Sequence, residues 1–346
     1  MSFLDDGPAP AAPQRLVVLM PTWFGDVLMG TPTLHALREH FPQIHLAAAV
    51  RADLVPLLEG NPDLDRVIGL EAGGKGPHVM EAGNRLHDGG FDTAVLLPNS
   101  LRSAMLARLA GIPRRIGYVR DGRGVLLTDR LIPRKKKRKF VPVPTVEYYL
   151  QLARYLGAPG ADPRMRVTAT ADDRAAAAGL GLEPGRYLVL NPGAAKPEKR
   201  WPAARFAAAA DALAEEHGLA VAVTGAPDES DAAAAVVEAM RTPAVDLVAA
   251  GVGLAAGKAV MADAALLLTG DTGPRHLAAA CNTPVVTLFG PTAPGWTTID
   301  FAKESQLVSR DGTMEGLTVD EVVEAAGELL GVSAAIASRE PATAGA

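Results

Sequence analysis

The string Gly270-Asp-Thr-Gly-Pro-Arg-His276 places small, hydroxyl and charged side chains directly after an apolar segment. If a strand ends and a helix begins there, the first N–H groups of the helix have no partner within it and suit an anion such as a diphosphate. Gly273 permits a tight turn, and Thr272 adds a hydroxyl donor. Asp271 either caps the helix, as an ordinary N-cap residue does, or meets a sugar hydroxyl. His276 either donates to a phosphate or packs as a helix histidine.

A second string of this kind runs from Asn191 to Pro202 after another apolar segment. Gly193 and Ala194 are small enough for the backbone to approach a phosphate, and Pro202 suits the first position of the next helix. The string also carries three cations, namely Lys196, Lys199 and Arg200. We therefore expect both strings to line one anion site.

Two carboxylates follow other strand-like segments. Glu229 comes shortly after Thr224-Gly225, where it could meet a ribose, although acidic residues favour the first turn of any helix. Asp26 ends the string Pro21-Thr-Trp-Phe-Gly-Asp26. A carboxylate there can act as a general base on a hydroxyl, and helix capping is the alternative of equal weight.

Several enzyme classes lack their motifs in this chain. There is no G-x-G-x-x-G with a matching acidic residue, which disfavours a dinucleotide dehydrogenase, and no G-x-x-x-x-G-K-[ST] of a P-loop NTPase. No H-E-x-x-H occurs, and the seven histidines are scattered. We therefore expect no bound metal and no cofactor.

Composition narrows the class of protein. With 346 residues the chain is long enough for two domains. The net charge of −5 disfavours a nucleic-acid partner. The single cysteine excludes an internal disulfide, which fits a reducing compartment. No run of 18 apolar residues and no secretory signal are present, so the sequence predicts a cytoplasmic protein.

One charge cluster stands out in this acidic chain. Its six consecutive cations are Arg134, Lys135, Lys136, Lys137, Arg138 and Lys139. They form either a solvated loop or a surface attracted to an anionic membrane or acidic glycolipid, where each cation gains roughly 1 kcal/mol. A nuclear signal is a formal third interpretation that nothing else supports.

Short apolar segments alternate with helical patterns in both halves, which predicts two doubly wound domains with mainly parallel sheets. The expected strands are 15–20, 44–50, 66–70, 93–97, 116–118, 187–190, 220–224, 245–249, 265–269 and 283–289. The expected helices are 25–40, 54–59, 103–110, 146–156, 172–180, 202–217, 228–240, one beginning at 275, and 319–330. We assign 1–14 to a disordered leader, 15–160 and 161–332 to the two domains, and 333–346 to a disordered tail. Ligands of such sheets bind at the carboxyl ends of the strands.

Four stretches in this order resemble glycosyltransferase family 9, the ADP-heptose:lipopolysaccharide heptosyltransferases, of the heptosyltransferase II type. They are Pro21–Met29; Leu96–Ser103 with Gly111–Gly117; Asn191–Ala195 with Lys199–Pro202; and Gly270–His276 with Phe289–Thr292. The resemblance implies a GT-B fold, in which two Rossmann-like domains face each other across a cleft. It also implies that the first domain binds the acceptor and the second an ADP-sugar, with inverting transfer that needs no metal.

The resemblance also implies roles for single residues. Asp26 matches the base that deprotonates the acceptor hydroxyl, and Lys199 matches the donor lysine. Ala194 and Ala195 stand where some members have hydroxyl residues, so phosphate contacts there fall to backbone N–H groups. The other donor-binding residues implied are Gly193, Glu229, Asp271, Thr272, Gly273 and His276, and those expected to meet an acidic acceptor are Asn99, Ser100 and Arg102.

We therefore expect a monomeric, cytoplasmic glycosyltransferase, in peripheral contact with the inner membrane, that moves heptose from ADP-heptose to a lipopolysaccharide inner-core-like acceptor. Three alternatives stay open. The same fold could use another nucleotide-sugar and glycan, isomerise the donor as a sugar-nucleotide epimerase, or bind a nucleotide-sugar without turnover. The presence of Asp26 argues against the last of these.

Overall fold

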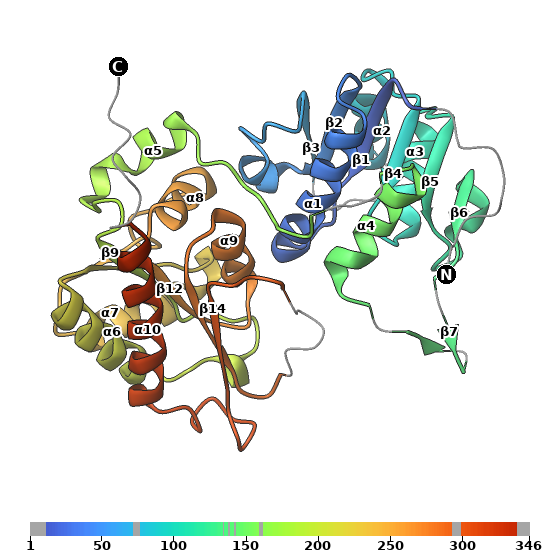
Figure 1. The fold of residues 1–346 in the computed structure, drawn as a ribbon. Helices are drawn as coiled ribbons and strands as arrows, with labels where there is room; N and C mark the ends of the chain where they lie inside the picture. Colours follow the sequence, from blue (N-terminus) through green and yellow to red (C-terminus); the bar gives the residue numbers. More distant parts are fainter. Residues whose placement is uncertain are drawn as a thin grey trace. The chain divides into compact units, whose positions relative to one another are not determined.

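The computed structural model describes residues 12–71, 77–133, 135–137, 139–141, 143–158, 162–292 and 299–337. The chain forms two compact units (Figure 1). Unit 1 runs to Thr168 and takes in Ile299 and Asp300, and unit 2 begins at Ala169. The sequence prediction placed this boundary eight residues earlier. Most of the predicted leader and the end of the predicted tail lie outside the described residues.

Unit 1 is built on a six-stranded sheet in the order β3-β2-β1-β4-β5-β6, with every neighbouring pair parallel. The strands are β1 (Arg15–Leu19), β2 (His45–Arg51), β3 (Arg66–Leu70), β4 (Thr93–Leu96), β5 (Arg114–Tyr118) and β6 (Asp129–Leu131). The helices are α1 (Phe24–His40), η1 (Ala52–Leu57), α2 (Pro77–His87), α3 (Leu101–Leu109), η2 (Arg123–Leu126) and α4 (Thr145–Tyr155). A short antiparallel hairpin joins β7 (Lys135–Lys136) to β8 (Lys139–Phe140).

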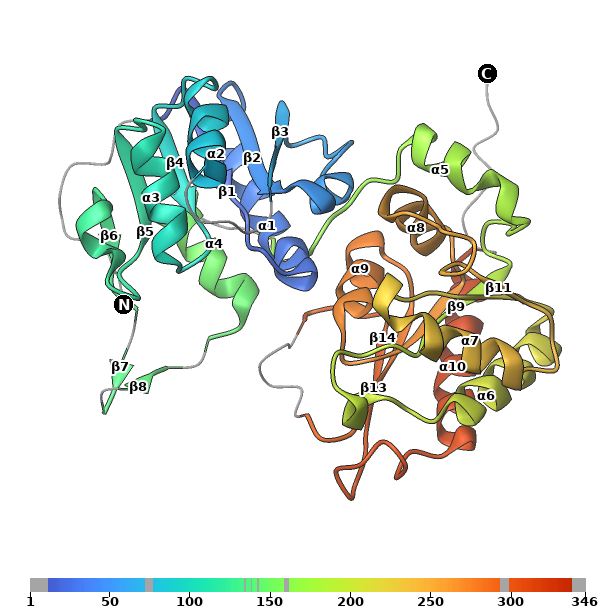
Figure 2. The same ribbon diagram turned by 180° about the vertical axis from the view of Figure 1, so that it is seen from behind.

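Helices cover both faces of this sheet, so its central strands β1 and β4 are apolar after their first residues, Arg15 and Thr93. α2 and α3 lie on one face, and α1 and α4 lie on the other (Figures 1 and 2). In β1, Val17 and Leu19 face the side of α2 and α3, where they join a buried cluster with Leu86 and Leu106. The β7–β8 hairpin stands away from the six-stranded sheet of unit 1 in both views.

Unit 2 repeats the architecture with a parallel sheet in the order β11-β10-β9-β12-β13-β14. Its strands are β9 (Tyr187–Asn191), β10 (Ala220–Val223), β11 (Ala244–Asp246), β12 (Leu266–Gly270), β13 (Val285–Phe289) and β14 (Glu304–Val308). Its helices are α5 (Ala171–Ala177), η3 (Ala178–Leu180), η4 (Pro197–Lys199), α6 (Ala203–His217), η5 (Pro227–Glu229), α7 (Ser230–Ala239), α8 (Leu254–Ala262), α9 (Gly273–Cys281) and α10 (Val319–Ala337).

The predicted fold class of two doubly wound α/β domains is confirmed, but some elements differ from the prediction. The sequence patterns missed α2, β6, α8 and β14. The segment of α8 is almost continuously small and apolar, so it shows no amphipathic period, and β14 is a partly exposed edge strand that begins with polar residues. The last helix also continues to Ala337, beyond the start of the predicted tail at Ser333. Among the described residues, no helix is both long and apolar enough to span a lipid bilayer.

Two ion pairs join α5 to α8 and differ sharply in burial. Lys258 Nζ lies 2.8 Å from Asp173 Oδ2, and the two side chains are 0% and 6% exposed. Arg174 Nη2 lies 2.9 Å from Asp263 Oδ1, with side chains 49% and 20% exposed. Asp173 also forms a capping box with Thr170 at the start of α5.

We predict that Lys258→Met lowers the free energy of unfolding of unit 2 by about 3–5 kcal/mol, because it leaves the carboxylate of Asp173 buried without its cation. The control Arg174→Met, which removes the exposed pair between the same helices, should cost no more than about 1 kcal/mol. Urea unfolding followed by the fluorescence of Trp201, which is buried in unit 2, measures both. Equal losses in the two variants would contradict the prediction.

Candidate functional site

The centre of the candidate site in unit 2 is Asn191, the last residue of β9, which is 1% exposed. Its Nδ2 group donates to Thr269 Oγ1 at 3.1 Å and to Thr272 Oγ1 at 3.2 Å, and it also lies 3.2 Å from the carbonyl of Gly193. β9 and β12 are parallel neighbours, so their carboxyl ends meet at one edge of the sheet. Asn191 thus ties together the two strings that the sequence predicted would share a site.

The helix that follows β12 begins without a side-chain cap. Thr272 is the N-cap residue of α9 and Gly273 its first helical residue, yet the side chain of Thr272 makes no capping hydrogen bond. The hydroxyl of Thr272 instead lies 3.2 Å from that of Thr269. The first N–H groups of α9 therefore keep the capacity to bind an anion that the sequence analysis expected.

Charged side chains gather beside this helix start. Lys199 Nζ lies 3.6 Å from Asp271 Oδ2, and Arg275 Nη1 lies 3.5 Å from Asp271 Oδ1. Arg275 is fully buried and also donates to the two carboxylate oxygens of Glu304 from Nε and Nη2, at 2.5 and 3.0 Å. A Cβ atom on Gly270 would lie 3.4 Å from the carbonyl of Lys199, so the two loops approach each other closely.

Gly193 and Glu229 are also neighbours. A Cβ atom on Gly193 would lie 2.2 Å from Glu229 Oε2, so any larger residue there would push this carboxylate aside. The same oxygen accepts a hydrogen bond of 3.0 Å from the N–H group of Ala226 at the start of η5. Ala194 is 2% exposed, and its carbonyl accepts from Arg200 Nε at 3.0 Å. Glu229 therefore supports a helix start here, and its contact with a ribose stays a prediction.

His276 lies in the first turn of α9 and is 4% exposed. Burial, with a smaller effect from the charge of Arg275, lowers the pKa of its imidazole to about 4. The ring is therefore neutral at pH 7, and its buried Nδ1 atom has no hydrogen-bond partner among the described residues. A contact between His276 and the donor stays a prediction.

In unit 1, Asp26 lies in the first turn of α1, directly after β1. Trp23 is the N-cap residue, and no side chain makes a capping hydrogen bond there, so Asp26 is not used as a cap. Burial raises the pKa of its carboxyl above the ordinary range. A carboxylate with a raised pKa is a stronger base than an exposed one, as general base catalysis requires.

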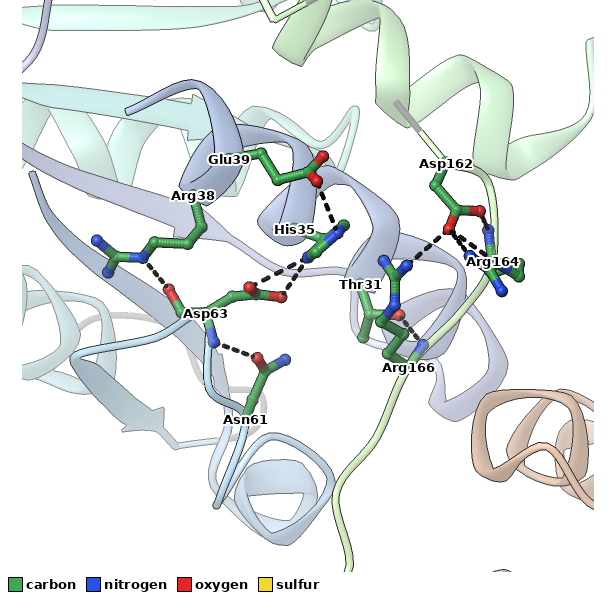
Figure 3. A network of polar contacts seen from close by, with 9 residues as sticks. All are labelled: Thr31, His35, Arg38, Glu39, Asn61, Asp63, Asp162, Arg164 and Arg166. Atoms are coloured by element: carbon green, nitrogen blue, oxygen red, sulfur yellow. Dashed lines mark hydrogen bonds and ion pairs between the residues drawn. The ribbon is translucent and has the colours of Figure 1, made fainter. Parts of the chain in front are cut away.

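α1 is held in place by polar contacts along its length (Figure 3). Pro32 has no N–H group to donate to the carbonyl of Leu28, and the hydroxyl of Thr31 donates to that carbonyl instead, at 2.7 Å. Thr31 Oγ1 also accepts from the N–H group of Arg166 at 3.0 Å. One turn further on, His35 Nδ1 lies 3.2 Å from both carboxylate oxygens of Asp63.

The turn after β4 carries the residues predicted to meet an acceptor. Asn99 Oδ1 accepts from the hydroxyl of Tyr148 at 3.1 Å and from Arg123 Nη2 at 3.4 Å. Ser100 is the N-cap residue of α3, and its hydroxyl accepts from the N–H group of Ser103 at 3.3 Å. The Ser100 hydroxyl therefore has a structural task, and its contact with an acceptor stays a prediction.

Arg102 lies in the first turn of α3 and is only partly exposed. Its Nη2 group donates to the carbonyl of Glu71 at 3.4 Å, while its buried Nε has no partner among the described residues. In the basic run, Lys137 is exposed at the tip of the β7–β8 hairpin with φ of 49°, and Arg134 and Arg138 lie outside the described residues.

Comparison with known proteins identifies the family of this chain. The family model of glycosyltransferase family 9 (heptosyltransferase) matches residues 79–316. The chain belongs to glycosyltransferase family 9. Membership confirms the predicted family and makes the chain a glycosyltransferase.

Among curated relatives of this family 9 enzyme, lipopolysaccharide heptosyltransferase 2 of Escherichia coli K12 is 28% identical over 303 residues, with 82% of this chain and 84% of the relative covered. Lipooligosaccharide heptosyltransferase 2 of Haemophilus influenzae is 28% identical over 337 residues, covering 87% and 93%.

Two solved structures of related glycosyltransferases have a similar fold. A family 9 glycosyltransferase from Veillonella parvula has a TM-score of 0.82 at 25% identity, covering 92% of this chain and 97% of that one. The ADP-heptose lipopolysaccharide heptosyltransferase II of Escherichia coli has a TM-score of 0.79 at 26% identity, covering 92% and 99%. The chain thus has the GT-B fold that the resemblance implied, while the facing of the two units across a cleft stays a prediction.

Sequence reasoning missed four polar residues of these two sites in the family 9 enzyme. Arg275 lies in the string Gly270–His276, but nothing in the sequence indicated that its side chain is buried. Glu304 reaches Arg275 because β14 lies next to β13, and the edge strand itself had not been recognised. Arg123 and Tyr148 reach Asn99 from a short 3-10 helix and from α4, and no spacing in the sequence connects them.

We predict that His276 makes unit 2 of this glycosyltransferase sensitive to acid. Its pKa is 6.5 in the unfolded chain and about 4 when folded, so the unfolded state takes up the proton first as the pH falls. Stability is therefore complete above pH 6.5 and declines by up to about 3 kcal/mol toward pH 4. Urea unfolding at pH 7.5 and 4.5 should show a smaller difference in His276→Gln than in the wild type. An equal loss of stability between the two pH values in both proteins would show that His276 is not the source of the acid sensitivity.

Proposed function

We propose that this family 9 glycosyltransferase moves heptose from ADP-heptose to a hydroxyl group of a lipopolysaccharide inner-core-like acceptor, with inversion at the anomeric carbon and without a metal. The observation that carries the proposal is the helix start in unit 2. There the first turn of α9, which the side chain of its N-cap residue Thr272 does not cap, lies beside Asn191 and Lys199, at the joined ends of β9 and β12. The names of its curated relatives, heptosyltransferases of lipopolysaccharide and lipooligosaccharide, point to the same reaction.

In the proposed mechanism unit 2 stabilises the leaving group. The bond between the anomeric carbon and the β-phosphate oxygen breaks, and negative charge develops on the ADP diphosphate. The N–H groups of α9 and the ammonium group of Lys199 meet that charge in fixed positions, so they need not reorganise during the reaction. Asp271, Thr272, Gly273 and His276 surround the same helix start and contact the diphosphate or the sugar.

Unit 1 supplies the base. Asp26 accepts the proton of the acceptor hydroxyl as its oxygen forms the new bond to the anomeric carbon. Attack on the face opposite the departing ADP inverts the configuration. Asn99, Ser100 and Arg102 hold the acidic acceptor, and Glu229 in unit 2 holds the ribose of the donor. The two substrates are thus bound by different units of the chain.

We predict that Asp26→Asn lowers kcat by about 10²–10⁴, the usual contribution of a general base, because an amide cannot take the proton. Thermal stabilisation by ADP should be unchanged, since nucleotide binds to unit 2. For the wild type, the acidic limb of kcat/KM against pH should lie above the value of about 3.9 typical of aspartate, because burial raises the pKa of Asp26. The release of ADP in the presence of acceptor measures kcat and kcat/KM.

The control for this experiment is Asp53→Asn, which removes a partly exposed carboxylate of unit 1 that is paired with Arg51. It should keep the wild-type kcat. A folded Asp26→Asn enzyme with full activity would remove Asp26 as the base. Activity with UDP- or GDP-sugars but not with ADP-heptose would support the alternative of another donor and refute this one.

We also propose that unit 1 binds the cytoplasmic face of the inner membrane through the basic run 134–139. Exposed apolar side chains stand on both sides of the run in the sequence, with Ile132 74% and Phe140 39% exposed. Clustered cations beside exposed apolar side chains fit an anionic lipid surface, to which the cations are attracted while the apolar groups enter the headgroup region.

We predict that replacing all six cations of the run with glutamine weakens binding to vesicles that contain an anionic lipid by more than tenfold, because each cation contributes roughly 1 kcal/mol at such a surface. Co-sedimentation with vesicles measures the binding. The control is the double variant Arg164→Gln/Arg241→Gln, which removes exposed arginines elsewhere and should bind as the wild type does. Undiminished binding of the six-fold variant would assign the run to a solvated loop.

A further inference from the structure

Arg123 is an arginine whose side chain is completely buried in unit 1, with 0% exposure. Its Nε donates to the carbonyl of Tyr118 at 2.9 Å, and its Nη1 donates to the hydroxyl of Ser103 at 3.0 Å and to the carbonyl of Pro98. Its Nη2 donates to Asn99 Oδ1 at 3.4 Å. None of these acceptors is a carboxylate. Burial lowers the pKa of the guanidinium to about 10, so Arg123 is still charged at neutral pH.

The backbone around Arg123 is shaped to bring it inside. Asp121 and Gly122 both have left-handed φ angles, of 52° and 75°, and they turn the chain so that η2 begins with Arg123. A Cβ atom on Gly117 in β5 would lie 2.9 Å from Arg123 Nη2, so glycine leaves the space that the guanidinium fills. A left-handed aspartate is unfavourable by itself, and the hydrogen bonds of the buried guanidinium can offset its cost.

The contact with Arg123 decides which way the amide of Asn99 points. A guanidinium has only donors, so the atom of Asn99 that meets it must be the carbonyl oxygen. The hydroxyl of Tyr148 lies 3.1 Å from the same oxygen, and its ring stacks on that of Tyr118 at a centroid distance of 4.0 Å. Asn99 is partly exposed, and among the described residues none accepts a hydrogen bond from its amide nitrogen. Its two N–H donors are left for a ligand.

We propose that Arg123 is a positioning residue of the acceptor site: it fixes the amide of Asn99 so that this residue presents N–H donors to an anionic oxygen, of a carboxylate or a phosphate, on the acceptor. The positive charge behind the amide oxygen polarises the amide toward donation. Arg123 itself touches no ligand, because it has no exposed surface. The proposal rests on the proposed function, which places the acceptor at the turn after β4.

The sharpest variant is Asn99→Asp, which keeps the oxygen that Arg123 and Tyr148 bind but replaces the donors with a second carboxylate oxygen. If the contact only stabilised the fold, this variant would be as active as the wild type, since its pair with Arg123 becomes an ion pair. We expect it to keep its Tm but to raise the KM for heptose-free lipopolysaccharide core at least a hundredfold. Its KM for ADP-heptose should be unchanged.

Arg123→Lys keeps the charge but loses the arm that reaches Asn99. We expect the acceptor KM to rise about tenfold, because the variant loses one hydrogen bond. When Arg123→Lys is combined with Asn99→Ala, the acceptor KM should rise no further than in Asn99→Ala alone, because both changes remove the same interaction. Tyr148→Phe, which removes the other donor to Asn99, gives the same test if Arg123→Lys does not fold. The control Arg115→Lys alters an arginine of β5 whose side chain donates only to backbone carbonyls, and it should leave the acceptor KM unchanged.

A second measurement needs no turnover and so separates this proposal from the proposed function. The side-chain NH₂ resonances of Asn99, assigned by their loss in Asn99→Ala, should shift when the wild type is titrated with inorganic phosphate or with acetate, and the stronger response identifies the preferred anion. The shift should be reduced in Arg123→Lys or Tyr148→Phe and retained in Arg115→Lys. An absent shift in the wild type, or an undiminished one in both variants, overturns the proposal. Failure of heptose transfer alone overturns only the proposed function.

Discussion

The parallel pairing of β1 with β4, and of β9 with β12, is the constraint on which both candidate sites depend. In each unit the chain builds the sheet outward in one direction, then crosses over and continues on the other side of the first strand. In sheets of this topology the loops that leave the two central strands diverge to opposite faces, and ligands bind between them at the carboxyl edge. Asp26 and Asn99 follow the central pair of unit 1, and Asn191 and Thr272 follow that of unit 2.

The same constraint explains what the sequence could predict. A strand buried on both faces is a short continuous apolar run, and a polar string directly after it must lie at the carboxyl edge. This reasoning located Asp26, Lys199 and Asp271, together with both sheets. It could not locate Arg123 or Glu304, whose side chains reach the sites from a left-handed turn and from an edge strand. Their positions depend on which strands are neighbours, and periodicity along one segment does not carry that information.

Charge at the unit 2 site is largely compensated by the protein itself. Lys199 and Arg275 each lie within 4 Å of Asp271, and Arg275 also pairs with Glu304. Side-chain cations that are already paired exert a weaker field on a ligand than isolated ones do. The fixed partial charges at the start of α9 therefore gain weight in anion binding, since the side chain of its N-cap residue Thr272 does not cap them. Lys199, which is 26% exposed, can leave Asp271 for a diphosphate while Arg275 stays paired with that carboxylate.

The buried cations of the two units are compensated in different ways, which bears on the ligand each unit takes. In unit 2, Lys258 and Arg275 are both completely buried and both have a carboxylate within 3 Å. Arg123 in unit 1 is equally buried, but its hydrogen bonds go to neutral oxygens. Neutral oxygens satisfy the donors of a guanidinium without cancelling its charge, and the low dielectric of the interior lets that charge act over a longer distance. If the proposed function is right, a charge placed in this way behind the turn after β4 would favour an acidic acceptor over a neutral sugar there.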